Sequence, residues 1–339
     1  MRGSNRLGKF AKKVLKRKSF WICFAILIFI YVNNSSLFAK APAGQPHLLA
    51  HRGLAQTFNM TGLTNDTCTA QRIYPPEHPY LENTIASMRA AFNKGADMVE
   101  FDVQPTKDGQ FAIFHDWTLD CRTNGTGVTR DHTMKELKSL DIGYGYTADG
   151  GKTYPFRGKG VGLMPSLEEV LEAFPNRMFL IDVKSNDPTE GIQLADHLAK
   201  LPVERREQLA VYGGDEPIAA LKKKLPDMRV MSKATEKGCL LRYLAIGWTG
   251  VVPEACEKTE LHIPEKFAPL LWGWPTRFLD RMDQAGTRVI LVAGSGDFSR
   301  GFDTAGDLKR IPPDYNGWIW TNRIDRIAPL VKGKKDVAK

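Results

Sequence analysis

The stretch MVEFDVQPTKDGQFAIFHD, residues 98–116, contains two short apolar runs that each end in ionisable residues. Similar runs occur at LLAH (48–51) and FLIDVK (179–184). A strand that is buried on both faces reads as continuous hydrophobics, so charges at its carboxyl end indicate a parallel sheet with a functional edge. We therefore expect the four run ends to meet at one edge of a parallel sheet.

Strand-like and helix-like segments alternate through residues 46–331. Besides the four runs, strands are expected at 209–213, 229–233, 261–264, 288–293 and 318–321. Helices are expected at about 83–94, 134–140, 166–174, 190–200, 217–224, 235–246, 275–284 and 325–331. This alternation predicts one α/β domain, a (β/α)8 barrel of the TIM type, with its active site at the carboxyl ends of the strands. Since the candidate strands outnumber those of such a barrel by one, we expect one to be a hairpin strand or no strand.

Composition is consistent with a large folded core and gives no sign of nucleic-acid binding. Apolar residues make up 42% and aromatic residues 10% of the 339 residues, enough for one large core or two smaller ones, and we favour one. The formal net charge is +9, but residues 1–18 carry +8 and residues 332–339 carry +3, so the body between them carries −2. A basic stripe for nucleic-acid phosphates is not evident.

A basic segment and then an apolar segment open the chain. FWICFAILIFIYV at 20–32 follows eight Lys and Arg residues that have no acid among them. Its length matches the ~7–15 residues of a signal-peptide core, and extension through residue 39 would allow an uncleaved transmembrane anchor. We favour the anchor, with a buried helix of a soluble protein as the remaining alternative; either membrane interpretation puts the body on the periplasmic side of the inner membrane. The expected divisions are a basic segment (1–19), the anchor or signal core (20–39), the barrel domain (46–331) and a basic tail (332–339).

Cysteine usage agrees with export. Cys23 lies in the apolar segment, and the body contains Cys68, Cys121, Cys239 and Cys256. None of these four forms a CxxC pair or sits with a histidine at zinc spacing, so a thiolate metal site is not expected. Four cysteines allow three disulfide connectivities. We hypothesise the pairs Cys68–Cys121 and Cys239–Cys256, with ordinary buried thiols as the alternative.

The run ends supply groups for metal-assisted phosphate chemistry. Glu100 and Asp102 are two residues apart on one strand and therefore share a face. With Asp182 from another run they would form an oxygen-rich site that suits Mg²⁺ or Ca²⁺ rather than zinc. Arg52 and Lys184 add two cations that can bind phosphate oxygens.

Two histidines complete this set. His51 and His115 have side-chain pKa values near the working pH, so they can divide the roles of general base and general acid. A single cluster of this kind more often contains a structural histidine or a salt-bridged acid. Four such clusters at one edge of a barrel are hard to explain in that way. The other histidines fall in turns or on helix faces and receive no role: His47, His78, His132, His197 and His262.

The same clusters resemble the glycerophosphodiester phosphodiesterase family. The similar motifs are HRG at 51–53, ENT at 82–84, the E-x-D of VEFDV, FHD at 114–116 and WTN at 320–322. Their order and approximate spacing also match, over roughly residues 46–331. The resemblance implies a TIM-barrel enzyme that uses a divalent cation to hydrolyse glycerophosphodiesters to glycerol 3-phosphate and an alcohol, through a cyclic phosphate.

The resemblance also implies residue roles. They are catalytic His51 and His115, metal ligands Glu100, Asp102 and Asp182, and substrate-binding Arg52, Lys184 and Glu82. Asp182 stands where the family usually has the Glu of an E-x-K strand, as in phospholipase-D toxins with a related barrel, so the cation must lie nearer this strand or a water must intervene. Glu82 would hold His51 or Arg52, unless it serves only to cap the following helix.

Two alternative functions remain open from the sequence. One is a lysophospholipase D that acts on lysophospholipids at the membrane, to which an amino-terminal anchor would give access. The other is a non-catalytic barrel that binds a phosphorylated ligand, although such a protein has no need for two titratable histidines. The expected partners are a small-molecule substrate and the inner membrane, with no obligatory protein partner evident.

Overall fold

Eight parallel strands form a nearly closed barrel in the computed structural model, which describes residues 4–39, 44–64, 67–297 and 300–333. The strands follow the order β6-β5-β4-β2-β1-β9-β8-β7, and a single parallel bridge, Val230 to Thr259, joins β6 to β7. Their bounds are β1 (His47–His51), β2 (Met98–Pro105), β4 (Met178–Val183), β5 (Leu209–Gly213), β6 (Arg229–Met231), β7 (Glu260–Pro264), β8 (Arg288–Val292) and β9 (Trp318–Thr321). The predicted barrel is confirmed.

The FAIFHD run is the exception among the predicted strands. Its strand, β3 (Phe111–Ile113), pairs antiparallel with the end of β2 and lies outside the barrel order, so its prediction as a parallel barrel strand was wrong. Only residues 106–110 connect the two strands, and a parallel crossover needs about a dozen residues or more. The hairpin nevertheless returns the chain to the barrel mouth, where the Phe114 amide donates to the Asp102 carbonyl over 3.1 Å.

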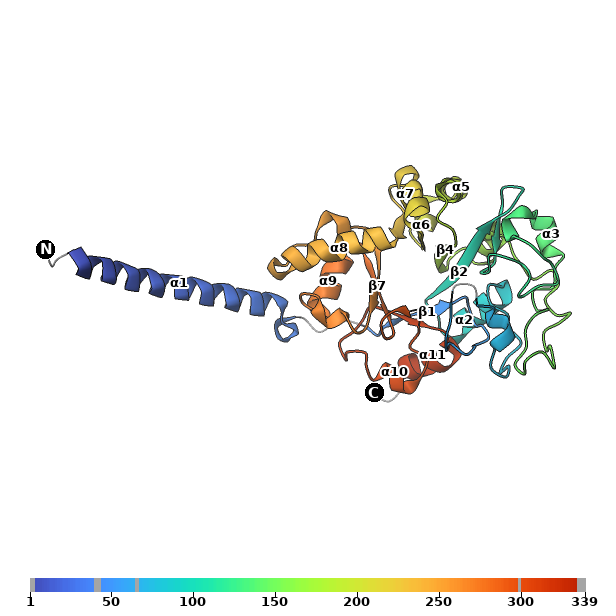
Figure 1. Ribbon diagram of the computed structural model, residues 1–339, viewed down its shortest axis with the longest axis horizontal. Coiled ribbons are helices and arrows are strands. Elements are labelled where there is room, and N and C mark those ends of the chain that lie inside the picture. The colour runs from blue at the N-terminus through green and yellow to red at the C-terminus, as the bar shows by residue number, and fades with distance from the viewer. Residues whose placement is uncertain (1–3, 40–43, 65–66, 298–299, 334–339) are drawn as a thin grey trace.

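Helices surround the barrel on its outer face (Figure 1). Their bounds are α2 (Ile85–Lys94), α3 (Met134–Lys138), α4 (Leu167–Ala173), α5 (Pro188–Leu198), α6 (Val203–Arg206), α7 (Asp215–Lys224), α8 (Lys233–Ile246), α9 (Thr276–Gln284), α10 (Ala305–Leu308) and α11 (Ile324–Lys332). The predicted cap of α4 is present, because the Ser166 hydroxyl accepts from the Glu169 amide and the Glu169 carboxylate accepts from the Ser166 amide. This reciprocal pair satisfies two amides that a helix start leaves free.

The alternation of side chains along β2 decides which residues enter the barrel. Val99, Phe101 and Val103 belong to the core between the strands and the helices. Met98 belongs instead to a smaller apolar cluster with Leu49, Leu180, Ala210 and Trp320. Because successive side chains of a strand point to opposite faces, Glu100 and Asp102 share the inward face with Met98.

The amino-terminal helix α1 (Ser4–Asn34) extends away from the barrel and reaches it near α8 and α9 (Figure 1). Its last residue, Asn34, is fixed there by its side-chain amide. The nitrogen of that amide donates to the Trp248 carbonyl over 2.9 Å, and its oxygen accepts from Arg281 over 3.0 Å. Apolar side chains of its predicted membrane segment, such as Trp21 and Leu27, are exposed. Within the described part of the chain, no helix combines the length and hydropathy needed to cross a membrane. The basic tail beyond Gly333 lies outside the described residues.

Both hypothesised disulfides are present. Cys68 is bonded to Cys121, and Cys239 on α8 is bonded to Cys256. Both cysteines of the second bond lie in the connection between β6 and β7, the two strands that a single bridge links. Two disulfides indicate an oxidising, extracytoplasmic compartment.

Candidate active site

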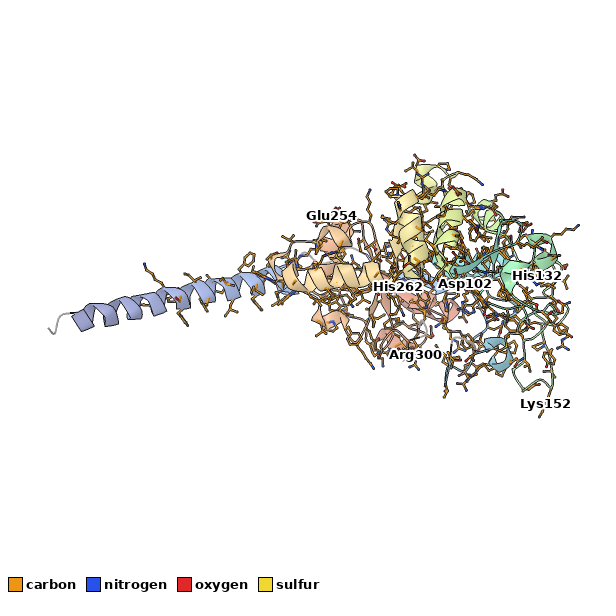
Figure 2. The ribbon with its side chains drawn as sticks, turned by 45° about the horizontal axis from the view of Figure 1, so that its top comes forward. Asp102, His132, Lys152, Glu254, His262 and Arg300 are labelled. Carbon is orange, nitrogen blue, oxygen red and sulfur yellow. A yellow bond between two sulfur atoms is a disulfide. The ribbon has the colours of Figure 1, made fainter. Side chains whose placement is uncertain are left out.

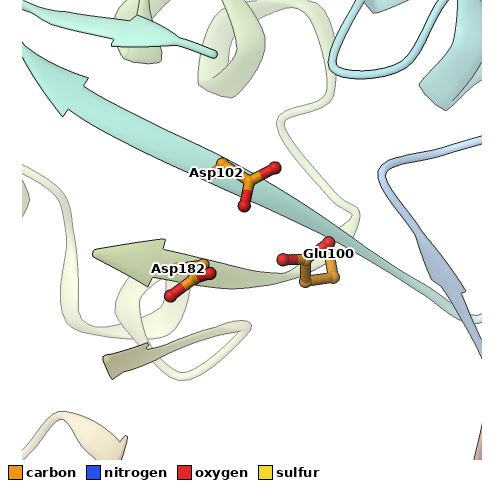
Figure 3. A group of neighbouring side chains, drawn as sticks. All are labelled: Glu100, Asp102 and Asp182. Atoms are coloured by element: carbon orange, nitrogen blue, oxygen red, sulfur yellow. The ribbon is translucent and has the colours of Figure 1, made fainter. Parts of the chain in front are cut away.

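Backbone register brings the acidic strand-end residues together. His51 on β1 is in register with Glu100 on β2, and Asp102 on β2 is in register with Asp182 on β4. Figure 3 shows the carboxylates of Glu100, Asp102 and Asp182 around a common space. One oxygen from each lies within 4.8 Å of the others, and all three residues are buried.

These three acids carry more negative charge than their two cationic neighbours offset. Lys184 Nζ lies 3.0 Å from Asp182 and 3.4 Å from Asp102, and Arg52 Nε lies 3.1 Å from Asp102. Burial, together with the neighbouring charge of Asp102, raises the pKa of Glu100 and that of Asp182. Burial alone would also raise the pKa of Asp102, but Arg52 and Lys184 outweigh it and lower that pKa.

The donor set fits a hard divalent cation. It consists of carboxylate oxygens, which suit Mg²⁺ or Ca²⁺, and the buried Oδ1 of Asp102 has no hydrogen-bond partner. An additional positive charge would offset the excess negative charge, which contributes to the raised pKa of Glu100 and of Asp182. The shorter Asp182 reaches the cluster even though its side chain has one methylene fewer than Glu.

Two further residues orient these acids. Asn83 donates to Asp102 Oδ2 over 2.7 Å and accepts from the Asp102 amide over 3.2 Å. The Tyr212 hydroxyl donates to Glu100 Oε1 over 2.8 Å. Such partners fix the orientation of metal-binding carboxylates. Asn83 also has a φ of 59°, a left-handed conformation that asparagine tolerates better than most residues.

The HRG turn places Arg52 against the acids. Arg52 has a φ of 56° and Gly53 a φ of 80°, and a Cβ on Gly53 would lie 2.6 Å from the Ser87 hydroxyl, so only glycine fits there. The Arg52 amide donates to Glu100 over 3.1 Å, and its guanidinium donates to Glu82 over 3.1 Å. Despite burial, the charges of Asp102 and Glu82 raise the pKa of Arg52.

His51 is held through its Nδ1 atom. That atom lies 2.6 Å from Asn322 Oδ1, and the Asn322 amide nitrogen donates to Asp303 over 3.0 Å. Since the amide oxygen only accepts, Nδ1 of His51 carries the proton and its Nε2 presents a lone pair. Burial and the Arg52 charge lower the pKa of His51, which keeps the ring neutral. Its Nε2 lies 3.8 Å from Glu100.

His115 is held in the same way by a carboxylate. Its Nδ1 donates to Asp116 Oδ1 over 2.7 Å, and the other oxygen of Asp116 accepts from Arg122 Nε over 2.7 Å. Burial and the Arg52 charge lower the pKa of His115. Burial alone would raise the pKa of Asp116, but Arg122 lowers it, so Asp116 stays ionised.

The structure thus brings together all eight residues selected from the sequence. Lys184 and Glu82 occupy supporting positions: Lys184 contacts the acids, and Glu82 contacts Arg52 rather than His51. Sequence reasoning missed several supporting residues. Three of them, Asn83, Asp116 and Asn322, lie within the quoted ENT, HD and WTN motifs, so the motifs contained a usable signal. For Tyr212 and Arg122 no such signal exists.

A cavity of about 580 Å³ opens beside His51 and Arg52. Phe58, Met60 and Tyr74 contribute apolar surface to its wall, and arginines including Arg300 contribute charge. Its lining is therefore mixed rather than wholly polar or apolar. Asp102, which is labelled in Figure 2, is fully buried.

Comparison with known proteins gives two related enzymes. A glycerophosphodiester phosphodiesterase of Bacillus subtilis is 40% identical over 124 residues, which are 35% of this chain and 39% of that protein. The human lysophospholipase D GDPD1 is 32% identical over 180 residues, 51% of this chain and 53% of that protein. The matched segments therefore span about two fifths to one half of these curated relatives.

Comparison of structures and of family patterns extends the similarity. The solved glycerophosphoryl diester phosphodiesterase domain of a Mycobacterium tuberculosis protein has a TM-score of 0.60 at 17% identity, over 85% of this chain and 99% of that domain, which supports the shared fold. The pattern of the glycerophosphoryl diester phosphodiesterase family matches residues 51–235. This match covers more than half of the chain and contains all eight residues selected above. The chain therefore belongs to the glycerophosphoryl diester phosphodiesterase family.

Proposed function

We propose that this chain hydrolyses glycerophosphodiesters to glycerol 3-phosphate and an alcohol, by acid–base catalysis beside a divalent cation. The observation that carries the proposal is the matched anchoring of His51 and His115. Each has its Nδ1 fixed by an oxygen acceptor, which leaves Nε2 for a substrate. The charge of Asp102 acts on the pKa of both histidines, so both lie beside the acidic cluster. Family membership supports the same reaction.

Glu100, Asp102 and Asp182 would hold the cation. Once bound, it would offset the charge that develops on the phosphate oxygens. Carboxylate oxygens suit both Ca²⁺ and Mg²⁺, and the three acids lie close enough together to share one such ion.

The chain's own residues would bind the phosphate and move two protons. Arg52 would orient the phosphate through its guanidinium. Neutral His51 would take the proton of a free glycerol hydroxyl as its oxygen attacks phosphorus. His115, entering the step as the imidazolium paired with the Asp116 carboxylate, would protonate the departing alkoxide. A cyclic phosphate results. Water would then open the ring with the two roles reversed, which returns both histidines to their starting protonation states.

The direct test is release of glycerol 3-phosphate and choline from glycerophosphocholine with CaCl₂ or MgCl₂. We expect EDTA to abolish release and added cation to restore it. His115→Ala should remove turnover while preserving the fold and the cation affinity, because Asp116 and Arg122 still pair. The matched control is His132→Ala, since the His132 ring contacts the Thr126 carbonyl instead of a candidate site residue. Retention of more than about a tenth of the activity in His115→Ala, a loss below ~1.4 kcal/mol, would contradict the acid–base role.

A second candidate function is hydrolysis of lysophospholipids. Similarity to the human lysophospholipase D and the apolar surface of Phe58, Met60 and Tyr74 beside His51 favour it. The two substrates share the glycerophosphodiester group and differ in the acyl chain. Comparing kcat/KM for lysophosphatidylcholine with that for glycerophosphocholine separates them, and a higher value for the lipid would favour the second function.

We also propose that α1 attaches the barrel to the inner membrane on the periplasmic side, or directs export and is then cleaved. Its basic residues followed by the apolar segment at 20–32 support this arrangement. The two disulfides agree with an oxidising location. Membrane fractionation of the full chain, with mass determination of the product, distinguishes an anchored protein from a released one.

A further inference from the structure

Arg122 is a buried guanidinium that the proposed reaction does not use. It is 2% exposed and lies behind the site rather than in the cavity. Its Nε donates to Asp116 over 2.7 Å, and its Nη1 donates to Tyr146 over 2.6 Å and lies 2.9 Å from Glu82 Oε2. Its Nη2 donates to the Thr69 hydroxyl. Four fixed contacts therefore determine the position of this one side chain.

The two acids that Arg122 contacts are also the supports of two reactive residues. Asp116 uses its other oxygen to hold His115 Nδ1 at 2.7 Å. Glu82 uses its other oxygen to hold Arg52 Nη1 at 3.1 Å. Arg122 is thus the common link between the histidine and the phosphate-binding arginine. Without it, two buried carboxylates would lose their shared counter-charge, which is costly in a low-dielectric site.

The Cys68–Cys121 disulfide lies directly beside this link. Cys121 precedes Arg122, and Cys68 precedes Thr69, which accepts from Arg122. The bond therefore joins the segment that carries the guanidinium to the segment that carries one of its acceptors, across a sequence separation of 53 residues. The second disulfide joins α8 to the residues before β7 and has no contact with Arg122 among the described residues.

We propose that Arg122 is a positioning residue that fixes His115 and Arg52 relative to each other, and that the Cys68–Cys121 disulfide holds Arg122 in place, so that turnover requires the oxidised chain. The proposal rests on the proposed phosphodiesterase function and adds its dependence on redox state. On reduction by dithiothreitol, each sulfur gains one electron and one proton, and the reagent becomes its cyclic disulfide.

The two disulfides provide a matched pair of variants. Cys68→Ser/Cys121→Ser and Cys239→Ser/Cys256→Ser each remove one bond from the full chain, and both are assayed below their unfolding temperatures. We expect the first to lower kcat by about tenfold or more and to raise KM, because both His115 and Arg52 lose their alignment. We expect the second to lower the unfolding temperature and leave kcat and KM unchanged. A purely structural role predicts fewer active molecules with an unchanged KM, and that result would overturn the proposal.

Substitutions of Arg122 separate its charge from its geometry. A lysine keeps the positive charge but not the planar fork that contacts two acids at once. We therefore expect Arg122→Gln to lose more activity than Arg122→Lys, with both below the wild type and both retaining their affinity for Ca²⁺. Equal activity of Arg122→Lys and the wild type would contradict the positioning role.

A measurement without substrate keeps this inference separate from the proposed function. The Nδ1 proton of His115, hydrogen-bonded to Asp116, gives a deshielded NMR resonance that His115→Gln identifies by its loss. We expect the resonance to disappear in Cys68→Ser/Cys121→Ser and in the reduced wild type, and to persist in Cys239→Ser/Cys256→Ser. If the oxidised wild type hydrolyses no glycerophosphodiester, the proposed function fails. If the resonance persists in Cys68→Ser/Cys121→Ser, the proposed role of Arg122 and its disulfide is overturned.

Discussion

The two halves of the barrel mouth differ in their chemistry. In the first half, β1, β2 and β4 contribute His51, the carboxylates Glu100 and Asp102, and Asp182. In the second half, β5 to β9 contribute an aromatic surface, in which the rings of His262 and Trp320 have centroids 5.5 Å apart. Ionic chemistry is therefore concentrated on neighbouring strands, and the other half completes the enclosure.

The two halves also differ in how they hold their buried histidines. His51 and His115 each have an oxygen acceptor at Nδ1. His262 instead has a buried Nε2 without a hydrogen-bond partner, and burial lowers its pKa to about 3. Burial also lowers the pKa of His51 and His115, so a lowered pKa is common to all three histidines. An orienting acceptor, more than burial, thus distinguishes the histidines that can act in acid–base chemistry.

The largest effect that tests this contrast is expected at Glu100. Glu100→Gln removes the charge of a proposed ligand while keeping the shape of the side chain. We therefore expect the affinity for Ca²⁺ to fall by more than about 100-fold, since even supporting residues cost 10- to 100-fold. Turnover should fall with it. Calorimetric titration measures the affinity, and His262→Gln in the second half is the control. A similar loss in both variants would show that the two halves do not divide the chemistry in this way.

A smaller effect is expected where the second half contacts the first. Tyr212 on β5 donates to Glu100 over 2.8 Å, so Tyr212→Phe frees that carboxylate to rotate. We expect cation affinity to fall by about tenfold. The control is Tyr243→Phe, because the hydroxyl of Tyr243 contacts the Trp272 carbonyl and Arg281 instead. An unchanged affinity in Tyr212→Phe would limit the second half to enclosing the site.

The sequence predicted that the two acids of β2 share one face, for a physical reason. Two-residue periodicity on a buried strand places Glu100 and Asp102 on one face, and this local rule needs no tertiary information. One hairpin strand was expected among the nine candidates, but it was not assigned to FAIFHD, because this run has the same apolar pattern as a parallel strand. Only the short connection at 106–110 distinguishes the two. Local pattern alone therefore placed His115 at the barrel mouth but did not identify the antiparallel hairpin that brings it there.

Contacts made by single side chains from distant segments could not be predicted. Tyr212 ends an ordinary strand, and Arg122 lies in a connection with no repeating pattern. The role of Tyr212 depends on where the folded chain places Glu100, 112 residues away in the sequence. The role of Arg122 depends on the loop conformation that brings Asp116, 6 residues away, against its guanidinium. Both disulfide pairs, in contrast, were hypothesised correctly, although sequence alone does not rank the three possible connectivities by geometry.

Substitution of Glu236 in the second half is expected to change activity least, although it should change the free energy of unfolding measurably. Glu236 on α8 accepts from the His262 amide over 2.8 Å, and burial raises its pKa to about 7. Below about pH 4.5 the carboxyl is protonated in both the folded and the unfolded chain. As the pH rises towards 7, only the unfolded chain releases this proton, so the wild type loses stability.

Glu236→Gln keeps an oxygen acceptor for the His262 amide but cannot ionise. The variant should therefore match the wild type near pH 4 and become more stable by up to about 3 kcal/mol above pH 7. Urea unfolding of both proteins across this range measures the difference, and glycerophosphocholine turnover should be unchanged. A stability difference that does not vary with pH would mean that Glu236 is already ionised in the folded chain. An ionised carboxylate would then lie beside His262 in the second half, and the contrast between an ionic half and an enclosing half would no longer hold.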